Sequence, residues 1–526
     1  MALTGCGRAP QEVQKTQGGV LRLGIYHSPS EINPITTDST ISANLLDLLF
    51  NTLVRFSGDG QKNPELAEKW TESSDGLVWT FYLKKGVTFH DGTPLTAEDV
   101  KATLGTIQRT ERSGYAYALK NVKEIKVLDP STVQIAFYKA DSLLWDSLGV
   151  IGIAPKALIE NDPEFKTFNQ HPVGSGPFRF VSQSDEEIVL EANDRYFGGR
   201  PYLDRVIVKV LSSQAANMNN LIAGNIDMAF ILNPEDYGAL SQIRSIHVYD
   251  NWYPLLYMVF LNHDNHLFAD PRVRQALNLA VDKDRLIERL LKGKGAAAGG
   301  TVDDGHESHN PSVVPYPYKP QEALKLLRDA GWADRDGDFI LDKDGRKFQF
   351  DAYAVQGEEL TSKALRILQQ QLSEIGVRMV IRELPFDEYV RVVVRERKFD
   401  ANVANLVVRS LYDSNFTYWH SSQIKAGLNF CSYRNREVDR LLDESRFEVD
   451  PAKRREAFQQ FQKVIHDDPP GIFLFWRNMP IAIQARFHDV PEKRMESLRD
   501  LVKVWEGSTR QSTSENAPAV PPARDR

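Results

Sequence analysis

The sequence predicts an α/β protein, because strand patterns and helix patterns follow one another along most of its length. Residues 77–83 alternate large apolar side chains with their neighbours, and residues 206–210 are a β-branched run, so both segments are predicted strands. Two helices are predicted to begin at Pro271 and Pro451. An aspartate precedes each proline as a potential N-cap, and apolar residues at helical spacing follow it.

A third helix is predicted over residues 365–375, with its apolar side chains on one face. Gly376 is expected to end it as the C′ residue, and a strand over residues 377–381 follows at once. At 526 residues the chain is too long for one hydrophobic core. We therefore expect two or more lobes.

Composition excludes several classes of protein. The chain is 42% hydrophobic and 26% charged, and its net charge of -7 shows no basic excess, so a nucleic-acid partner is not expected. The longest apolar run, residues 255–261, is far shorter than the about 20 residues that cross a bilayer. Cys6 and Cys431 supply neither a disulfide framework nor a zinc site. Cys431 is expected to be a small buried residue.

The two ends of the chain differ from its body. Leu3-Thr4-Gly5-Cys6 resembles a bacterial lipobox, although the charged and apolar regions of a signal peptide do not precede it. Our hypothesis is that the chain starts late and that the native product is a lipoprotein anchored through Cys6; the alternative is a chance match in a cytoplasmic protein. Residues 1–19 are expected to be this segment and a linker, and residues 507–526 a disordered tail.

Potential metal and catalytic motifs do not fit their patterns. The acidic stretch that begins at Asp334 lacks the glycine and the glutamate of an EF-hand, so we interpret it as a solvated turn and an Asp-Gly hairpin. His306, Glu307 and His309 form a loop cluster that we expect to be solvated. Residues 293–300 lack the ending of a phosphate-binding loop and are interpreted as a flexible connector. We expect no metal, no cofactor and no enzyme.

A long segment carries a specific resemblance. Residues 66–100 read LAEKWTESSDGLVWTFYLKKGVTFHDGTPLTAEDV, in which Thr96 and Asp99 are expected to form a capping pair. Further segments are VGSGPFRF at 173–180 and DPRVRQALNLAVDKDRLI at 270–287. Together they resemble the extracellular solute-binding proteins of family 5, which serve the dipeptide, oligopeptide and nickel importers of the ABC type.

The resemblance implies a two-lobed periplasmic-binding-protein-like fold (type II, cluster C), with a hinge and an enclosed ligand. Lobe I is expected to comprise residues 20–262 plus 477–506, with an inserted subdomain at about 61–165, and lobe II residues 263–476. The implied role is ligand delivery to an ABC permease and ATPase complex. The protein is expected to be a monomer in the periplasm or at the outer face of the cytoplasmic membrane.

The resemblance also implies the ligand-binding residues, which fall into three groups. They are His27, Ser28 and Pro29; Tyr115 and Tyr117; and Asn405, Leu406, Val407, Arg409, Tyr412 and Asp413. Arg409 occupies the place where peptide binders of the family carry an aspartate for the peptide's amino group, and a guanidinium would repel that group. Two explanations stay open: Asp413 binds the amino group of an oligopeptide, or the ligand is an anionic solute, a sugar or a nickel complex, the last contacting His420. A ligand sensor on the same fold is a further alternative.

Overall fold

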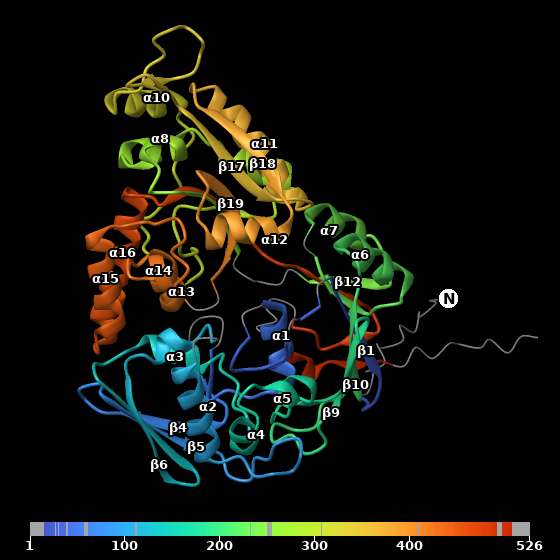
Figure 1. Cartoon of the computed structure of the whole chain (residues 1–526). Coiled ribbons are helices and arrows are strands. Elements are labelled where there is room, and N and C mark those ends of the chain that lie inside the picture. The colour runs from blue at the N-terminus through green and yellow to red at the C-terminus, as the bar shows by residue number, and fades with distance from the viewer. Residues whose placement is uncertain are drawn as a thin grey trace, which may run out of the picture.

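The computed structural model describes residues 15–26, 28–29, 31–37, 40–56, 61–110, 113–231, 233–249, 255–306, 308–408, 411–491 and 497–507. Strands and helices are mixed throughout, and two large sheets define two lobes (Figure 1). We call the part built on the seven-stranded sheet lobe I and the part built on the six-stranded sheet lobe II. No described helix is both long enough and apolar enough to cross a membrane.

The seven-stranded sheet of lobe I has the strand order β12-β21-β11-β1-β10-β9-β8. Its strands are β1 (Val20–Ile25), β8 (Phe178–Gln183), β9 (Glu187–Ala192), β10 (Arg205–Val210), β11 (Met228–Phe230), β12 (Ile246–Tyr249) and β21 (Ile481–Gln484). β1 runs parallel to both β10 and β11, whereas β21 joins the sheet from near the end of the chain. The helices of this part are α1 (Thr40–Leu49), α6 (Gln214–Ala223) and α7 (Pro234–Leu240).

The inserted subdomain is built on a four-stranded sheet of order β4-β5-β7-β6. Its elements are β4 (Ala67–Glu72), β5 (Val78–Leu83), β6 (Val122–Asp129), β7 (Thr132–Phe137), α2 (Ala97–Arg109), η1 (Ala116–Leu119), α3 (Leu143–Leu148), α4 (Lys156–Asn161) and α5 (Lys166–Gln170). The hairpin of β2 (Val54–Phe56) and β3 (Lys62–Pro64) leads into it. One continuous hydrophobic core joins this sheet to the seven-stranded sheet. The subdomain is therefore packed as part of lobe I.

The six-stranded sheet of lobe II has the order β14-β20-β13-β19-β17-β18. Its strands are β13 (Leu255–Leu261), β14 (Ala296–Ala297), β17 (Gln349–Val355), β18 (Arg378–Leu384), β19 (Ala401–Val407) and β20 (Gly471–Arg477). Its helical elements are η2 (His266–Phe268), α8 (Pro271–Leu279), α9 (Lys283–Leu291), α10 (Pro320–Asp329), α11 (Glu359–Ser373), α12 (Phe386–Tyr389), η3 (Val390–Arg395), α13 (Leu411–Trp419), α14 (Gln423–Ala426), α15 (Arg436–Phe447) and α16 (Pro451–Asp467).

β13 corrects the predicted lobe boundary. The sequence-based division placed residues up to 262 in lobe I, whereas β13 pairs with β19 and β20 inside the six-stranded sheet. All seven of its residues are buried, and alternate side chains enter separate hydrophobic cores on the two faces of the sheet. A strand this apolar needs cover on both sides, which a central position supplies. The chain thus enters lobe II between β12 and β13 and returns between β20 and β21.

The segment after β21 packs against the core of lobe I. It comprises β22 (Phe487–His488), η4 (Leu498–Lys503) and β23 (Trp505–Glu506). Arg499 lies buried beside the equally buried Glu65, with a hydrogen bond to the Glu65 carboxylate and another of 2.7 Å from Nη2 to the Phe50 carbonyl. Glu65 also accepts hydrogen bonds from Asn51 and Thr52. The returning segment is therefore tied to the start of the inserted subdomain.

Several local predictions are confirmed. Asp270 and Asp450 cap α8 and α16 through their side chains, and Thr96 and Asp99 form the capping box of α2. At the end of α11, Gly376 has a φ of +74° and its N–H donates to the Ser373 carbonyl, while the N–H of the next residue reaches Leu372. This is the Schellman pattern expected of a C′ glycine.

The glycine-rich residues 293–300 differ from the flexible connector that the sequence predicted. They include β14, which pairs with β20 at the edge of the six-stranded sheet. A Cβ on Gly295 would lie 2.9 Å from the Trp476 carbonyl oxygen, and one on Gly299 would lie 2.6 Å from the backbone of Val314. Glycine serves here to let two backbones approach closely.

Two motifs far apart in the sequence meet at His90. The Gly174 N–H donates to Nδ1 of His90 over 3.2 Å, and Nε2 of the same ring lies 3.1 Å from the Gly176 carbonyl oxygen. Together these contacts fit the neutral ring with its proton on Nε2. Burial lowers the pKa of His90 to about 4. Residues 90–94 (HDGTP) and residues 174–178 (GSGPF) are therefore held in direct contact by the His90 ring.

Candidate functional site

The inserted subdomain contacts lobe II through a buried ion pair. Nη2 of Arg446, near the end of α15, lies 2.6 Å from the carboxylate of Asp141, which precedes α3. Nε of Arg446 lies 3.0 and 3.1 Å from the two carboxylate oxygens. The Asp141 side chain is 0% exposed and that of Arg446 is 10% exposed. Desolvation raises the pKa of the Asp141 carboxyl, and the adjacent guanidinium opposes that rise.

Further contacts surround this pair. Both the backbone N–H and the hydroxyl of Ser142 donate to the Arg446 carbonyl oxygen over 2.8 Å. Leu143 packs into the core of lobe II that contains Phe416. The ammonium of Lys139 lies 3.7 Å from the centre of the Phe447 ring. In Figure 1, α3 lies next to the α13 end of lobe II. The two lobes are therefore in contact on the side away from their connecting segments.

A cavity of about 350 Å³ lies at this contact, and we call it the interlobe cavity. The inserted subdomain contributes Tyr117, Lys120 and Asn121 to its lining. Lobe II contributes Phe416 of α13, Gln423 of α14 with its N-cap Ser422, and Arg446 and Phe447 of α15. The cavity thus combines aromatic faces, amide and hydroxyl groups and two cationic side chains. It exists only where the two lobes meet.

A second set of polar contacts lies where the chain passes from one lobe to the other. Arg477, the last residue of β20, donates from Nη2 to the Ile231 carbonyl of lobe I over 3.2 Å. The Ile231 N–H in turn donates to the Pro480 carbonyl over 2.7 Å. Tyr257 of β13 lies opposite Asn405 of β19, and burial raises the pKa of the Tyr257 hydroxyl. These bonds fix the connecting segments of the two lobes to each other.

The described residues of the predicted ligand site fall in different environments. Tyr117 lines the interlobe cavity, whereas Tyr115 packs against the core of lobe I. Asn405 is exposed on β19, and Leu406 beside it is buried in the core of lobe II. Ser28 is exposed and Pro29 is buried just after β1.

The other predicted site residues lie outside what the structure describes. His27 and Arg409 are not among the described residues, nor are the side chains of Val407, Tyr412 and Asp413. The possible lipidation site Cys6 and the tail over residues 508–526 also lie outside them. The role that the resemblance assigns to Arg409 and Asp413 therefore stays a prediction.

Sequence reasoning missed Asp141 and Arg446, which join the two lobes, and Lys120, which lines the interlobe cavity. Asp141 and Ser142 stand in an ordinary strand-to-helix connection, and Arg446 is one of several arginines on an amphipathic helix. No local pattern distinguishes a surface arginine from one that pairs across a lobe contact. Only the tertiary packing shows which of these residues lie at the lobe contact.

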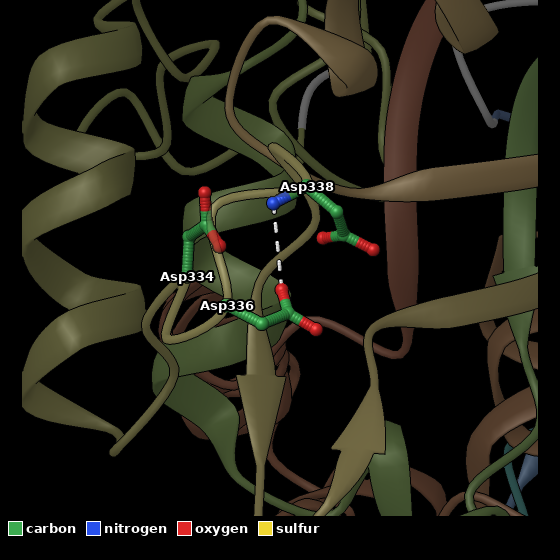
Figure 2. Close-up of side chains that lie close together, drawn as sticks. All are labelled: Asp334, Asp336 and Asp338. Atoms are coloured by element: carbon green, nitrogen blue, oxygen red, sulfur yellow. Dashed lines mark hydrogen bonds between the residues drawn. The ribbon is translucent and has the colours of Figure 1, made fainter.

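The acidic stretch forms a turn and a hairpin, as the sequence predicted. Asp334, Asp336 and Asp338 lie together on an exposed turn, with carboxylate oxygens within 4.8 Å of one another (Figure 2). Lys347 pairs with Asp336 at 2.6 Å and with Asp338 at 2.9 Å, so part of their charge is already balanced. Asp344 and Gly345, both at positive φ, connect β15 (Asp342–Lys343) to β16 (Arg346–Lys347).

The remaining histidines and the cysteine do not form a second site among the described residues. His420 is buried, its ring stacks on Phe416, and its Nδ1 lies 2.8 Å from the Ser422 hydroxyl. His309 lies 3.9 Å from exposed Asp304. Cys431 is buried, as predicted, and burial raises the pKa of its thiol to about 12. A thiol held neutral in this way is a poor nucleophile.

Comparison with known proteins covers nearly all of the chain. The family model "Bacterial extracellular solute-binding proteins, family 5 Middle" matches residues 62–427. Oligopeptide-binding protein AppA of Bacillus subtilis is 31% identical over 503 residues, which are 93% of this chain and 92% of that protein. The Escherichia coli dipeptide-binding protein is 26% identical, with 85% and 87% of the two chains covered.

Solved structures agree with this assignment. AppA from Bacillus subtilis in complex with a nonapeptide has a TM-score of 0.83 at 29% identity, and the match covers 94% of this chain and 100% of AppA. NikZ from Campylobacter jejuni in complex with Ni(L-His) has a TM-score of 0.84 at 25% identity and covers 93% and 99% of the two chains. The two-lobed fold that the sequence predicted is confirmed, and the chain belongs to the bacterial extracellular solute-binding proteins of family 5.

Proposed function

We propose that this protein is the substrate-binding protein of an ABC importer, which captures an oligopeptide or dipeptide between its lobes and delivers it to a membrane permease. The observation that carries the proposal is the buried Asp141–Arg446 pair, because it joins lobes whose connecting segments lie elsewhere. Contacts at two separate places are what a clamp in its closed state requires. The names of the relatives AppA and dipeptide-binding protein support a peptide as the cargo.

The lobe division follows the sheets. We propose that lobe I, with the inserted subdomain, and lobe II move as two bodies about the segments between β12 and β13 and between β20 and β21. The shared core of lobe I supports this, since parts that share one core do not separate at low cost. The protein acts as a monomer and performs no catalysis in this role.

We further propose that the protein works outside the cytoplasmic membrane and is held there by acylated Cys6. The LTGC pattern and the extracellular nature of the family support this location. Cells that express the protein behind its natural upstream region are fed a labelled fatty acid. Label on the wild type and none on Cys6→Ala is the expected result, and equal labelling of both would contradict it.

The cargo is identified from the protein itself. We expect protein purified without denaturation to release peptides on unfolding, detected by mass spectrometry. A refolded, ligand-free sample should gain thermal stability with the same synthetic peptides, because a ligand that binds only the native state raises the melting temperature by mass action. Release and binding of a sugar or a metal complex in place of peptides would contradict a peptide cargo.

A further inference from the structure

The interlobe cavity has a chemical character that goes beyond the proposed function, on which this inference rests. Its walls come from both lobes, so whatever occupies it contacts both at once. A volume of about 350 Å³ corresponds to about a dozen waters at their share of liquid volume. The space suits one amino-acid residue or a small organic group.

The charges in the lining have one sign. Lys120 and Arg446 are cationic, and no carboxylate is among the described residues that line the cavity. The exposed ammonium of Lys120 forms no ion pair with any described residue. Arg446 uses Nε and Nη2 for Asp141, while its Nη1 makes no hydrogen bond to the part of the chain that the structure describes. Donors are therefore left over for a ligand.

Aromatic rings hold the guanidinium in place. The centre of the Arg446 guanidinium lies 4.7 Å from the ring centre of Phe416 and 5.0 Å from that of Phe447. Together with the buried Asp141, these rings fix its orientation before any ligand arrives, which lowers the entropic cost of binding. The same rings offer apolar surface to the uncharged part of a ligand.

We propose that the interlobe cavity binds a carboxylate carried on a small apolar or aromatic group, such as one end or one side chain of the bound solute. Lys120 supplies charge from lobe I, and Arg446 supplies a positioned donor from lobe II. An ammonium group is disfavoured, because Lys120 repels it, whereas the charge of Arg446 is already balanced by Asp141. The carboxylate thereby bridges the lobes, and its binding energy stabilises the closed state.

The test uses a matched pair of probes, 3-phenylpropionate and its neutral analogue 3-phenylpropanamide, measured by ligand-detected NMR. The wild type is expected to bind the acid at least about fivefold more tightly than the amide, the size expected of a partly desolvated charge contact. In Lys120→Gln this preference should fall to about twofold or less. The control is Lys123→Gln, which removes the same charge from the exposed face of β6 and should keep the full preference.

Each outcome decides the inference. Equal affinity for acid and amide in the wild type, no binding of either, or an unchanged preference in Lys120→Gln would overturn it. Displacement of the acid by inorganic phosphate at lower concentration than by acetate would overturn the choice of carboxylate. If the proposed peptide cargo is wrong, the results differ. Synthetic peptides then do not bind, while the protein still binds 3-phenylpropionate more tightly than the amide, and this preference still depends on Lys120.

Discussion

Asp141 and Arg446 stand 305 positions apart in the sequence, yet the carboxylate of one lies 2.6 Å from Nη2 of the other, and both side chains are withdrawn from water. Breaking a buried pair by removing one charge costs about 3–5 kcal/mol, because the other charge stays behind without compensation. In this protein the pair spans two lobes. Its loss can therefore be relieved by opening the lobes instead of by unfolding them.

We predict that Asp141→Asn weakens ligand binding at least about tenfold, because closure then buries Arg446 without its partner. The melting temperature of the ligand-free protein should change little. Titration calorimetry gives the affinity, and small-angle scattering gives the compaction on adding ligand. Asp185→Asn, at an exposed position, is the matched control. A large drop in ligand-free stability with unchanged affinity would contradict a closure role.

A second prediction concerns the returning C-terminal segment. Arg499→Met should lower the free energy of unfolding by about 3–5 kcal/mol, since it leaves the Glu65 carboxylate buried and unpaired. Urea unfolding measures this change. Arg179→Met, which breaks a half-exposed pair with Glu191, should cost about 1 kcal/mol or less. Equal losses of unfolding free energy in the two variants would contradict a larger contribution from the buried Arg499–Glu65 contact.

Stability should fall as the pH drops from 7 towards 4. Burial lowers the pKa of His90 and of His263 to about 4, so between the unfolded value of 6.5 and about 4 the unfolded chain binds more protons. For each histidine, the decrease in pKa from 6.5 to about 4 corresponds to a loss of at most about 3 kcal/mol in the free energy of unfolding. Below pH 4 these two histidines cause no further loss. Urea unfolding at several pH values should show a shallower pH dependence for His90→Gln. An unchanged slope would contradict the assignment.

Gly174 should tolerate no side chain. A Cβ there would lie 1.9 Å from the backbone carbonyl oxygen of Leu49, which cannot turn away. We expect Gly174→Ala to lower the free energy of unfolding by more than about 2 kcal/mol, or to prevent folding. Gly238→Ala is the control, because its Cβ meets nothing within 4 Å and α7 should gain slightly from alanine. Thermal unfolding compares the two, and equal melting temperatures would contradict the close approach.

The sequence predicted the local elements better than their assembly. Caps such as Asp270 and Asp450, and the end of α11 at Gly376, depend on neighbours within a few residues, so local pattern suffices for them. The edge strand β14 was mistaken for a connector, because it pairs with the distant β20 and the neighbouring Gly295 permits that close approach, which local pattern does not reveal. The lobe boundary was misplaced for the same reason: an apolar run does not reveal which sheet buries it.

The candidate site shows the same division. Tyr117, which the family resemblance implies as a ligand-binding residue, lines the interlobe cavity, and its role in binding stays a prediction. Lys120 and Arg446 could not be predicted, since an isolated lysine in a turn and an arginine on an amphipathic helix are ordinary surface residues in any sequence. Their significance comes from the approach of two segments more than 300 residues apart, which only the folded chain brings together.

The core shared by the four-stranded and seven-stranded sheets limits how the protein can be engineered or shortened. Trp79 and Trp145 stack with ring centres 4.4 Å apart inside that core, and His90 ties the subdomain to the glycines beyond it. Deleting the insertion would expose apolar surface on the rest of lobe I, because the insertion is not an independent domain. Grafting the insertion of a relative should succeed only when the residues around the GSGPF segment are exchanged with it.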